Sequence, residues 1–120
     1  MILIDTSVWA DHFRVHLPEI GLLLASGGVV HHPFVTGELA MGNPTDRATM
    51  IEVLAALPQA NVVDAPDFLA FVERTRLFGT GLGFVDAHLL AAARAGEYRL
   101  WSSDKRLVRE AARLGLNHQA

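Results

Sequence analysis

The chain opens with MILIDTSVWADHF (residues 1–13), a short apolar run that ends in Asp5 and leads directly into an amphipathic stretch. The apolar run is typical of a short buried strand. Thr6 and Ser7 can cap a helix, and Val8, Trp9 and Phe13 follow at helical spacing. This stretch therefore predicts a strand that feeds straight into a helix, with Asp5 at the strand's carboxyl end.

The rest of the chain continues the alternation of short apolar runs and amphipathic stretches. Further strands are predicted in VVHHPFV (29–35), ANVVDA (60–65) and RLWSS (99–103). Helices are predicted at about 18–25, 35–41, 44–57, 66–78, 84–96 and 105–115. Strands that alternate with helices in this way indicate a parallel sheet covered on both faces. We expect an α/β fold: one three-layer α/β/α sandwich over residues 1–120, with a central parallel sheet of four or five strands.

The composition limits the class of protein. A chain of 120 residues has room for one hydrophobic core, and the complete lack of cysteine excludes a disulfide scaffold and thiolate metal sites. No apolar run approaches the roughly 20 residues that cross a bilayer, and acids stand near the start, where a signal peptide needs basic residues. We therefore expect a cytoplasmic protein with no membrane association.

The charges divide unevenly between the two parts of the chain. The net charge is −3, but residues 1–73 hold nine acids against two bases, whereas residues 74–120 hold eight bases against four acids. A basic second part can present a phosphate-binding face even on an acidic protein, although solvated helix faces would give the same composition. The candidate phosphate contacts in this part of the chain are Arg74, Arg76, Lys105 and Arg106.

Four acids lie at the carboxyl end of a predicted strand or in the first turns of the helix after it: Asp5, Glu38, Asp86 and Asp104. In parallel α/β sheets ligands bind beyond the carboxyl ends of the strands, so we expect the four side chains to meet at one edge. Clustered carboxylates repel one another unless a cation neutralises them. An all-oxygen site suits Mg²⁺ or Mn²⁺. Taken singly, each acid could instead be an ordinary helix cap.

Four segments carry a resemblance to a known family: ILIDTSVWADHF, VTGEL, GTGLGFVDAHLLAAA and LWSSDKRL. In this order they resemble the motifs of PIN-domain proteins, and most closely those of VapC-type toxins from type II toxin–antitoxin pairs. The resemblance covers nearly the whole chain. It implies a PIN-like domain, endoribonuclease activity dependent on Mg²⁺ or Mn²⁺, a homodimer, and inhibition by a cognate antitoxin protein.

Position by position, the resemblance assigns the family's catalytic and metal-binding acids to Asp5, Glu38, Asp86 and the more variable Asp104. Small hydroxyl residues accompany them at Thr6, Ser7 and Ser102, and these can orient a carboxylate or a metal-bound water. In this scheme a metal-activated water attacks the RNA phosphate in line, and the products carry a 5′-phosphate and a 3′-hydroxyl.

Other readings are open at this point. A non-catalytic PIN-like module that binds RNA or protein would have the same fold. A receiver-type phospho-signalling domain needs adjacent acids after its first strand, but here Thr6 and Ser7 follow Asp5; Ser7 also breaks the Asp-x-Asp pattern of a phosphatase. A zinc site at His31 and His32 is disfavoured, because adjacent residues on a strand point to opposite faces.

Two further features bear on partners. Trp9 and Phe13 lie one helical turn apart, so we expect them to share a face that belongs to the core, with an edge able to receive an antitoxin segment. The glycine-rich loop at residues 79–83 matches no phosphate-binding loop pattern. It is predicted to be a flexible connection that lets RNA approach Asp86.

Overall fold

Three short parallel strands form the centre of the molecule. The structure is a computed structural model and describes residues 1–119. Strand β1 (Ile2–Ile4) lies between β2 (Val29–Val30) and β3 (Arg99–Trp101), and both pairings are parallel. Leu3 stands opposite Val30 on one side and Leu100 on the other. The carboxyl ends of the strands therefore share one edge, which Asp5 and Ser102 follow directly.

The sheet has three strands within residues 1–119, not the four or five predicted. A single parallel bridge joins His31 to Gln59 at one edge, and another joins Leu100 to Asn117 at the opposite edge. The strand predicted at 60–65 is wrong, because this segment keeps only the hydrogen bonds that flank His31 and then leaves the sheet. Pro58 precedes it and Pro66 follows it, and proline limits a segment to the edge of a sheet.

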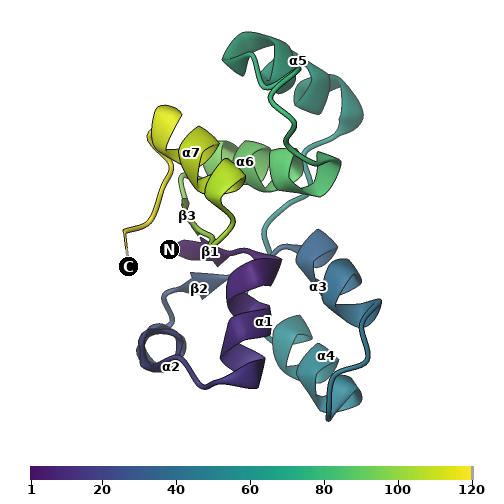
Figure 1. Cartoon of the computed structure of the whole chain (residues 1–120), viewed down its shortest axis with the longest axis vertical. Helices are drawn as coiled ribbons and strands as arrows, with labels where there is room; N and C mark the ends of the chain where they lie inside the picture. The colour runs from purple at the N-terminus through teal and green to yellow at the C-terminus, as the bar shows by residue number, and fades with distance from the viewer. Residues whose placement is uncertain (120) are drawn as a thin grey trace.

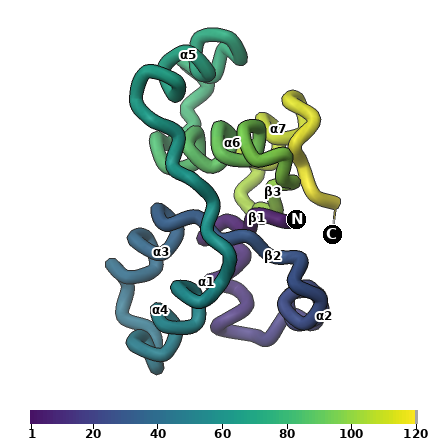
Figure 2. Tube along the Cα trace, turned by 180° about the vertical axis from the view of Figure 1, so that it is seen from behind, coloured from purple at the N-terminus to yellow at the C-terminus, as the bar shows by residue number. Residues whose placement is uncertain are grey.

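Seven helices surround the sheet in the described part of the chain. They are α1 (Thr6–Arg14), α2 (Pro18–Ser26), α3 (Pro33–Ala40), α4 (Arg47–Ala55), α5 (Ala65–Thr75), α6 (Phe84–Gly96) and α7 (Lys105–Arg113). Helices α1–α4 lie on one side of the sheet and α5–α7 on the other (Figure 1). The view from behind shows the link from α4 to α5 crossing between the two groups (Figure 2). The predicted three layers are confirmed.

The start of α3 corrects a second prediction. The expected strand over 29–35 ends at Val30, and Pro33 begins a helix instead of only stopping a strand. Proline suits the first turn of a helix, because its fixed φ is helical and its missing N–H would have no partner there. His32 caps this helix: its Nδ1 accepts the backbone N–H of Phe34 at 3.0 Å.

Helix α6 is the most deeply buried helix of the described chain. Seven successive residues, Ala87 to Ala93, are buried, as expected for a helix enclosed on nearly all sides. Leu3, Ile4 and Leu100 of the sheet are fully buried in the same hydrophobic core. This packing fixes the first turn of α6, which carries Asp86, next to the edge of the sheet. No helix within residues 1–119 has both the length and the apolar character needed to cross a membrane.

Candidate active site

Asp5 is the buried centre of the site. It ends the central strand, caps α1 by accepting the backbone N–H of Thr6 at 2.7 Å, and is only 4% exposed. Its second carboxylate oxygen accepts the hydroxyls of Ser7 and Ser102, each at 2.7 Å. Three donors thus give both oxygens of this buried carboxylate hydrogen-bond partners. The predicted hydroxyl positions at Ser7 and Ser102 therefore contact the first acid.

Glu38 is tied to the same cluster through Thr6. The Thr6 hydroxyl donates to Glu38 Oε1 at 2.6 Å, which joins the first turn of α1 to α3. Glu38 itself is exposed at the mouth of the site, unlike Asp5. His32 caps the helix that carries Glu38, and this role was not predicted from the sequence. A histidine directly before a proline at the start of a helix is the pattern that could have indicated it.

Asp104 caps α7. Its Oδ1 accepts the backbone N–H groups of Arg106 at 2.9 Å and Leu107 at 3.1 Å. The Asp104 N–H donates to Ser102 Oγ at 3.0 Å, so one serine contacts both Asp5 and Asp104. Asp104 is therefore a helix cap, as the alternative interpretation of this residue expected. Because the cap lies beside the other acids, it does not exclude a second role for Asp104 in the site.

Asp86 lies in the first turn of α6, half-buried, and no hydrogen-bond donor contacts its carboxylate within residues 1–119. Burial first, and then the charges of Asp5, Asp104 and Glu38, together raise the pKa of Asp86 from 3.8 to about 6. Three of the predicted acids thus lie close enough to the fourth, Asp86, to act on its charge.

The donor set fits a hard divalent cation. The four carboxylates lie on the same side of the molecule without cysteine or histidine among them, and within residues 1–119 Asp86 has no ion pair or hydrogen-bond donor to stabilise its ionised form. In the conformation of residues 1–119, no three potential ligands are spaced to surround one ion. Oxygen ligands of this kind are those that Mg²⁺ and Mn²⁺ take in proteins.

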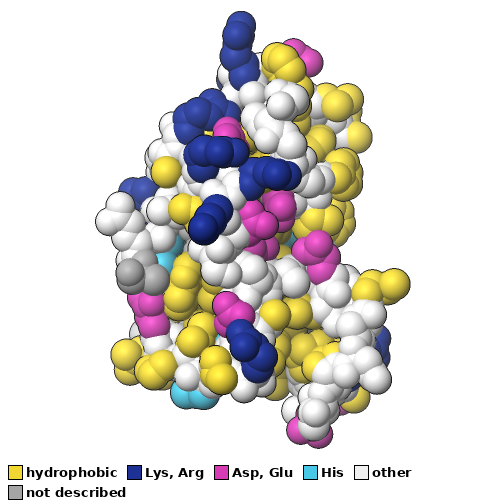
Figure 3. All heavy atoms as spheres, in the orientation of Figure 1, with side chains coloured by type: hydrophobic (Ala, Val, Ile, Leu, Met, Phe, Trp, Pro, Cys, Tyr) yellow, Lys and Arg dark blue, Asp and Glu magenta, His cyan; other side chains and the backbone are white. Residues whose placement is uncertain are grey.

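The predicted phosphate contacts fall into two places. Lys105 and Arg106 join Asp104 and Arg109 around an open cavity of about 520 Å³ beside the acids. Figure 3 shows the acidic side chains gathered at the middle of this face, with Lys and Arg side chains on the adjoining surface above them. Arg74 instead lines a cavity near the far end of α6 with Arg94, and Arg76 ends α5 with a φ of 57°.

The histidines do not form a metal site with the acids. His31 and His32 follow β2 and are fully buried on opposite sides of the chain: His31 contacts Trp9 of α1, and His32 contacts Phe34 near His88 of α6. The prediction that they face apart is confirmed. His88 is buried and stacks on Phe68 with ring centroids 3.9 Å apart, so it is a packing residue.

A receiver-type domain also needs a phosphate-accepting Asp after a central strand, and Asp64, which follows Val62 and Val63, is the residue at that place. Asp64 caps α5, where its Oδ1 accepts the N–H of Asp67 at 3.0 Å. No charge of Asp64 acts on Asp86, whereas three other acids do.

Comparison with known proteins gives the family. The chain is 44% identical over 117 residues to ribonuclease VapC32 of Mycobacterium tuberculosis, from both strain CDC 1551 / Oshkosh and strain H37Rv; the match covers 97% of this chain and 94% of the relative. This chain belongs to the VapC-type PIN ribonuclease family. The resemblance found in its motifs is thereby confirmed. No family model matches the sequence. Because the match leaves out only about 3% of this chain, nearly the whole fold lies within it.

Proposed function

We propose that this protein is an endoribonuclease toxin of a toxin–antitoxin pair, and that it hydrolyses RNA at the four-carboxylate site. The observation that carries the proposal is the meeting of Asp5, Glu38, Asp86 and Asp104 at one edge of the sheet, where burial and like charge raise the pKa of Asp86 to about 6. Such a perturbed group in a cluster of like charges is typical of functional sites. Family membership supports RNA as the substrate.

The metal of this proposal is Mg²⁺ or Mn²⁺. Asp5, Asp86 and Asp104 would hold it, and Glu38 would contribute directly or through water. A divalent ion in such a site lowers the pKa of a bound water and stabilises negative charge on phosphoryl oxygens. Metal binding requires ionised carboxylates, so we expect cleavage to increase as the pH rises through the pKa of Asp86, about 6.

The surrounding hydroxyls orient the acids. Ser7 and Ser102 hold one oxygen of Asp5, and the Thr6 hydroxyl holds one oxygen of Glu38. These bonds fix which carboxylate oxygens are turned toward a ligand and which are already occupied. Lys105 and Arg109 on the cavity beside Asp104 are suited to contact the RNA backbone, and this contact would follow RNA phosphates without reading sequence.

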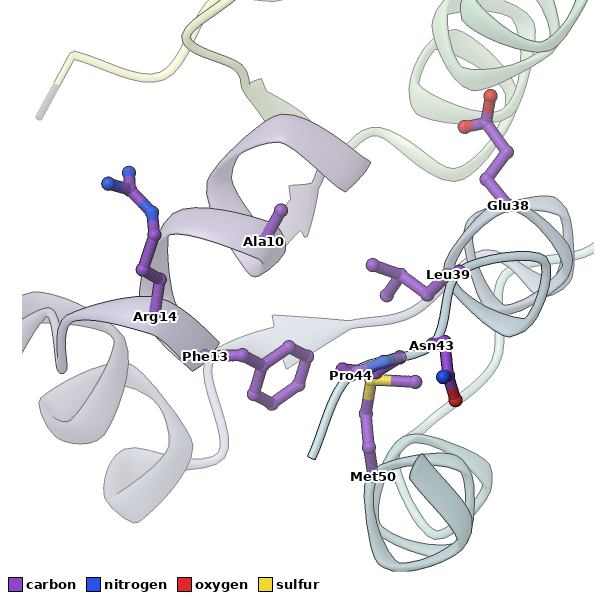
Figure 4. A pocket seen from close by; sticks show the side chains of 9 residues that line it. Ala10, Phe13, Arg14, Glu38, Leu39, Asn43, Pro44 and Met50 are labelled. Carbon is purple, nitrogen blue, oxygen red and sulfur yellow. The ribbon is translucent and has the colours of Figure 1, made fainter. Parts of the chain in front are cut away.

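An antitoxin is the expected protein partner, and a groove between α1 and α3–α4 is its candidate binding surface. The groove holds about 450 Å³, and apolar side chains of Phe13, Leu39, Pro44 and Met50 line it. Figure 4 shows the Phe13 ring pointing into it from α1, opposite Pro44 and Met50, with Glu38 at the end nearer the acids. Phe13 stacks on buried Trp9 with ring centroids 5.7 Å apart but is itself 41% exposed, which fits the predicted edge of a core face. A homodimer and a cytoplasmic location complete the proposal.

Purified protein incubated with total RNA tests the activity. With Mg²⁺ or Mn²⁺ we expect cuts at discrete sites with 5′-phosphate and 3′-hydroxyl ends, and no cuts in EDTA. Cyclic phosphate ends would contradict hydrolysis by a water, and cuts that persist in EDTA would contradict the metal site. A folded protein that binds RNA without cutting it would favour the non-catalytic binding module.

The groove is tested separately with the cognate antitoxin. Phe13→Asp should weaken antitoxin binding at least tenfold, because burying a carboxylate in an apolar groove is costly. The same variant should leave RNA cleavage by the free toxin within about twofold of the wild type. Leu22→Asp is the control, since Leu22 is 72% exposed on α2 and does not line the groove. Equal antitoxin affinity for both variants would remove the groove from the interface.

A further inference from the structure

Arg106 makes a long-range contact with the glycine-rich loop at residues 79–83. Its Nη1 donates to the Gly81 carbonyl oxygen at 2.8 Å. Gly81 has a φ of +81°, and a Cβ placed there would lie 3.2 Å from Arg106 Nη1 and 3.4 Å from Cζ. The guanidinium is therefore packed against the backbone of Gly81, in a space that a side chain at this position would fill.

Each end of this contact adjoins one of the carboxylates. The backbone N–H of Arg106 donates to Asp104 Oδ1, so the residue lies in the first turn capped by Asp104. Gly81 stands two residues before Gly83, the cap position of α6, and a Cβ on Gly83 would lie 3.6 Å from Asp86 Oδ2. The loop backbone thus flanks the Asp86 carboxylate, and Figures 1 and 2 both show α7 beside α6.

We propose that Arg106 is a positioning residue that holds the loop 79–83 against α7 and thereby keeps Asp86 beside Asp104. The inference rests on the proposed function, because it concerns the assembly of the proposed metal site. It replaces the prediction from sequence that Arg106 contacts RNA phosphate. It also changes the reading of the loop, which is a tethered connection and not only a flexible one.

The chemistry of the contact favours arginine over any other cation. Lysine carries the same charge but offers a compact ammonium on a flexible stem, whereas the guanidinium is planar and can hydrogen-bond while packing flat on a backbone. Arg106→Lys therefore separates the two roles. A phosphate contact keeps most of its strength with lysine, and a packed contact with Gly81 does not.

Three further variants complete the design. Gly81→Ala leaves every cation in place but puts a methyl group where the guanidinium lies. Gly79→Ala is its matched control: Gly79 also has a positive φ, +71°, but a Cβ there meets nothing within 4 Å. Arg109→Ala removes a neighbouring cation of α7 whose one ion pair within residues 1–119 is a 3.7 Å contact with Glu110.

Hydrogen exchange of the free protein, without metal or RNA, tests the contact itself. We expect faster exchange at the amides of residues 79–85 in Arg106→Lys and Gly81→Ala than in the wild type and Arg109→Ala, with melting curves confirming that all variants are folded. Gly79→Ala reports how much exchange changes through backbone strain alone. Unchanged exchange in Arg106→Lys would overturn the proposal.

Binding of Mn²⁺ to the RNA-free protein, followed by electron paramagnetic resonance, tests the consequence for the site. Arg106→Lys and Gly81→Ala should weaken Mn²⁺ binding about 10-fold or more, as loss of a supporting contact typically does. Arg109→Ala and Gly79→Ala should bind Mn²⁺ as the wild type does. In cleavage assays Arg106→Lys should lower kcat and leave KM for RNA within about twofold.

The remaining outcomes are distinct. Arg106→Ala, which removes the charge that Arg106→Lys keeps, is added to recognise a phosphate contact. A raised KM, a smaller salt dependence of RNA binding and unchanged Mn²⁺ affinity in this variant would identify such a contact and contradict the positioning role. Faster exchange with unchanged Mn²⁺ affinity would show that the contact exists but does not serve the acids, which also overturns the proposal. A wild-type protein with no Mn²⁺ affinity would instead refute the proposed metal site, while the exchange data would still decide whether Arg106 holds the loop.

Discussion

Asp86 differs from the other three acids in having no hydrogen-bond donor within residues 1–119. Asp5, Glu38 and Asp104 each accept at least one hydrogen bond that supports the carboxylate. The pKa of Asp86 is raised from 3.8 to about 6, first by burial and then by the other three acids. The metal-free fold therefore favours the protonated carboxyl group of Asp86, whereas a bound cation would favour the ionised carboxylate.

This asymmetry predicts that Asp86→Asn stabilises the metal-free protein. A folded pKa above the unfolded one gives stability at low pH that is lost as the pH rises from about 4 through 6. The loss is at most about 3 kcal/mol at neutral pH, and partial exposure reduces it to about 1–2 kcal/mol. In EDTA, urea unfolding should give Asp86→Asn a free energy of unfolding about 1–2 kcal/mol higher than that of the wild type at pH 7.5. At pH 4 the two proteins should differ by almost nothing. A variant less stable than the wild type at pH 7.5 would contradict the assigned environment.

Individual residues were predictable where local sequence determines them. Asp5 follows a strand, Asp86 and Asp104 open helices, and Glu38 lies in the second turn of the helix after β2, so their place near the carboxyl edge follows from chain order and the geometry of parallel sheets. The bond from Arg106 to Gly81 joins residues 25 positions apart through a loop without periodicity, and no local pattern indicates it. The same holds for the bond of Ser102 to Asp5, although its hydroxyl was expected near the acids.

At the scale of elements, α6 depends on close packing at its carboxyl end as well as on its buried middle. Gly96 is its last residue, and a Cβ there would overlap the Tyr98 ring at Cε2. The Tyr98 ring is partly buried against the core, so it has limited freedom to move away. The glycine thus allows the chain to turn from α6 into β3.

We predict that Gly96→Ala lowers the free energy of unfolding by about 1–3 kcal/mol, as overpacking of this kind does. Gly37→Ala is the matched control, because Gly37 lies within α3 and a Cβ there meets nothing within 4 Å. Alanine in an open helical position should stabilise by about 0.5–1 kcal/mol. Chemical denaturation measures both changes, and equal effects of the two substitutions would refute the packing argument.

The helices were easier to predict than the strands. Helical periodicity and caps are local, so α1, α2, α5, α6 and α7 lie close to their predicted ranges. A strand exists only where a neighbour pairs with it, and the apolar residues at 60–65 gave no information about that neighbour. Residues 61 and 62 follow the single bridge at Gln59 and are exposed. The pattern of apolar residues could not show that the pairing stops there.

At the scale of the whole molecule, buried neutral histidines make the fold sensitive to acid. Burial first, and then a neighbouring histidine, together lower the pKa of His31 and of His32 to about 4; the neighbours are His32 and His88 respectively. Both imidazoles are fully buried, so protonation would place an uncompensated charge in the core. Their contribution to stability is complete above the unfolded pKa of 6.5 and is lost as the pH falls toward 4.

His32→Asn tests this dependence, because asparagine can still cap α3 but does not titrate. We expect the variant to be less stable at pH 7.5, since packing is lost. The difference from the wild type should shrink by about 2 kcal/mol by pH 5, because the wild type alone must keep that imidazole neutral. A constant difference across this pH range would contradict the low pKa of His32.

The most direct test of the central claim compares two Asp→Asn substitutions in one RNA cleavage assay. Asp86→Asn removes a charge from the proposed site, whereas Asp64→Asn removes a charge from the α5 cap, where asparagine caps equally well. With Mg²⁺ or Mn²⁺ and protein free of antitoxin, the wild type and Asp64→Asn should cut RNA at the same discrete sites, and Asp86→Asn should not. Cleavage by folded Asp86→Asn at the wild-type rate would show that the four carboxylates are not the nuclease site.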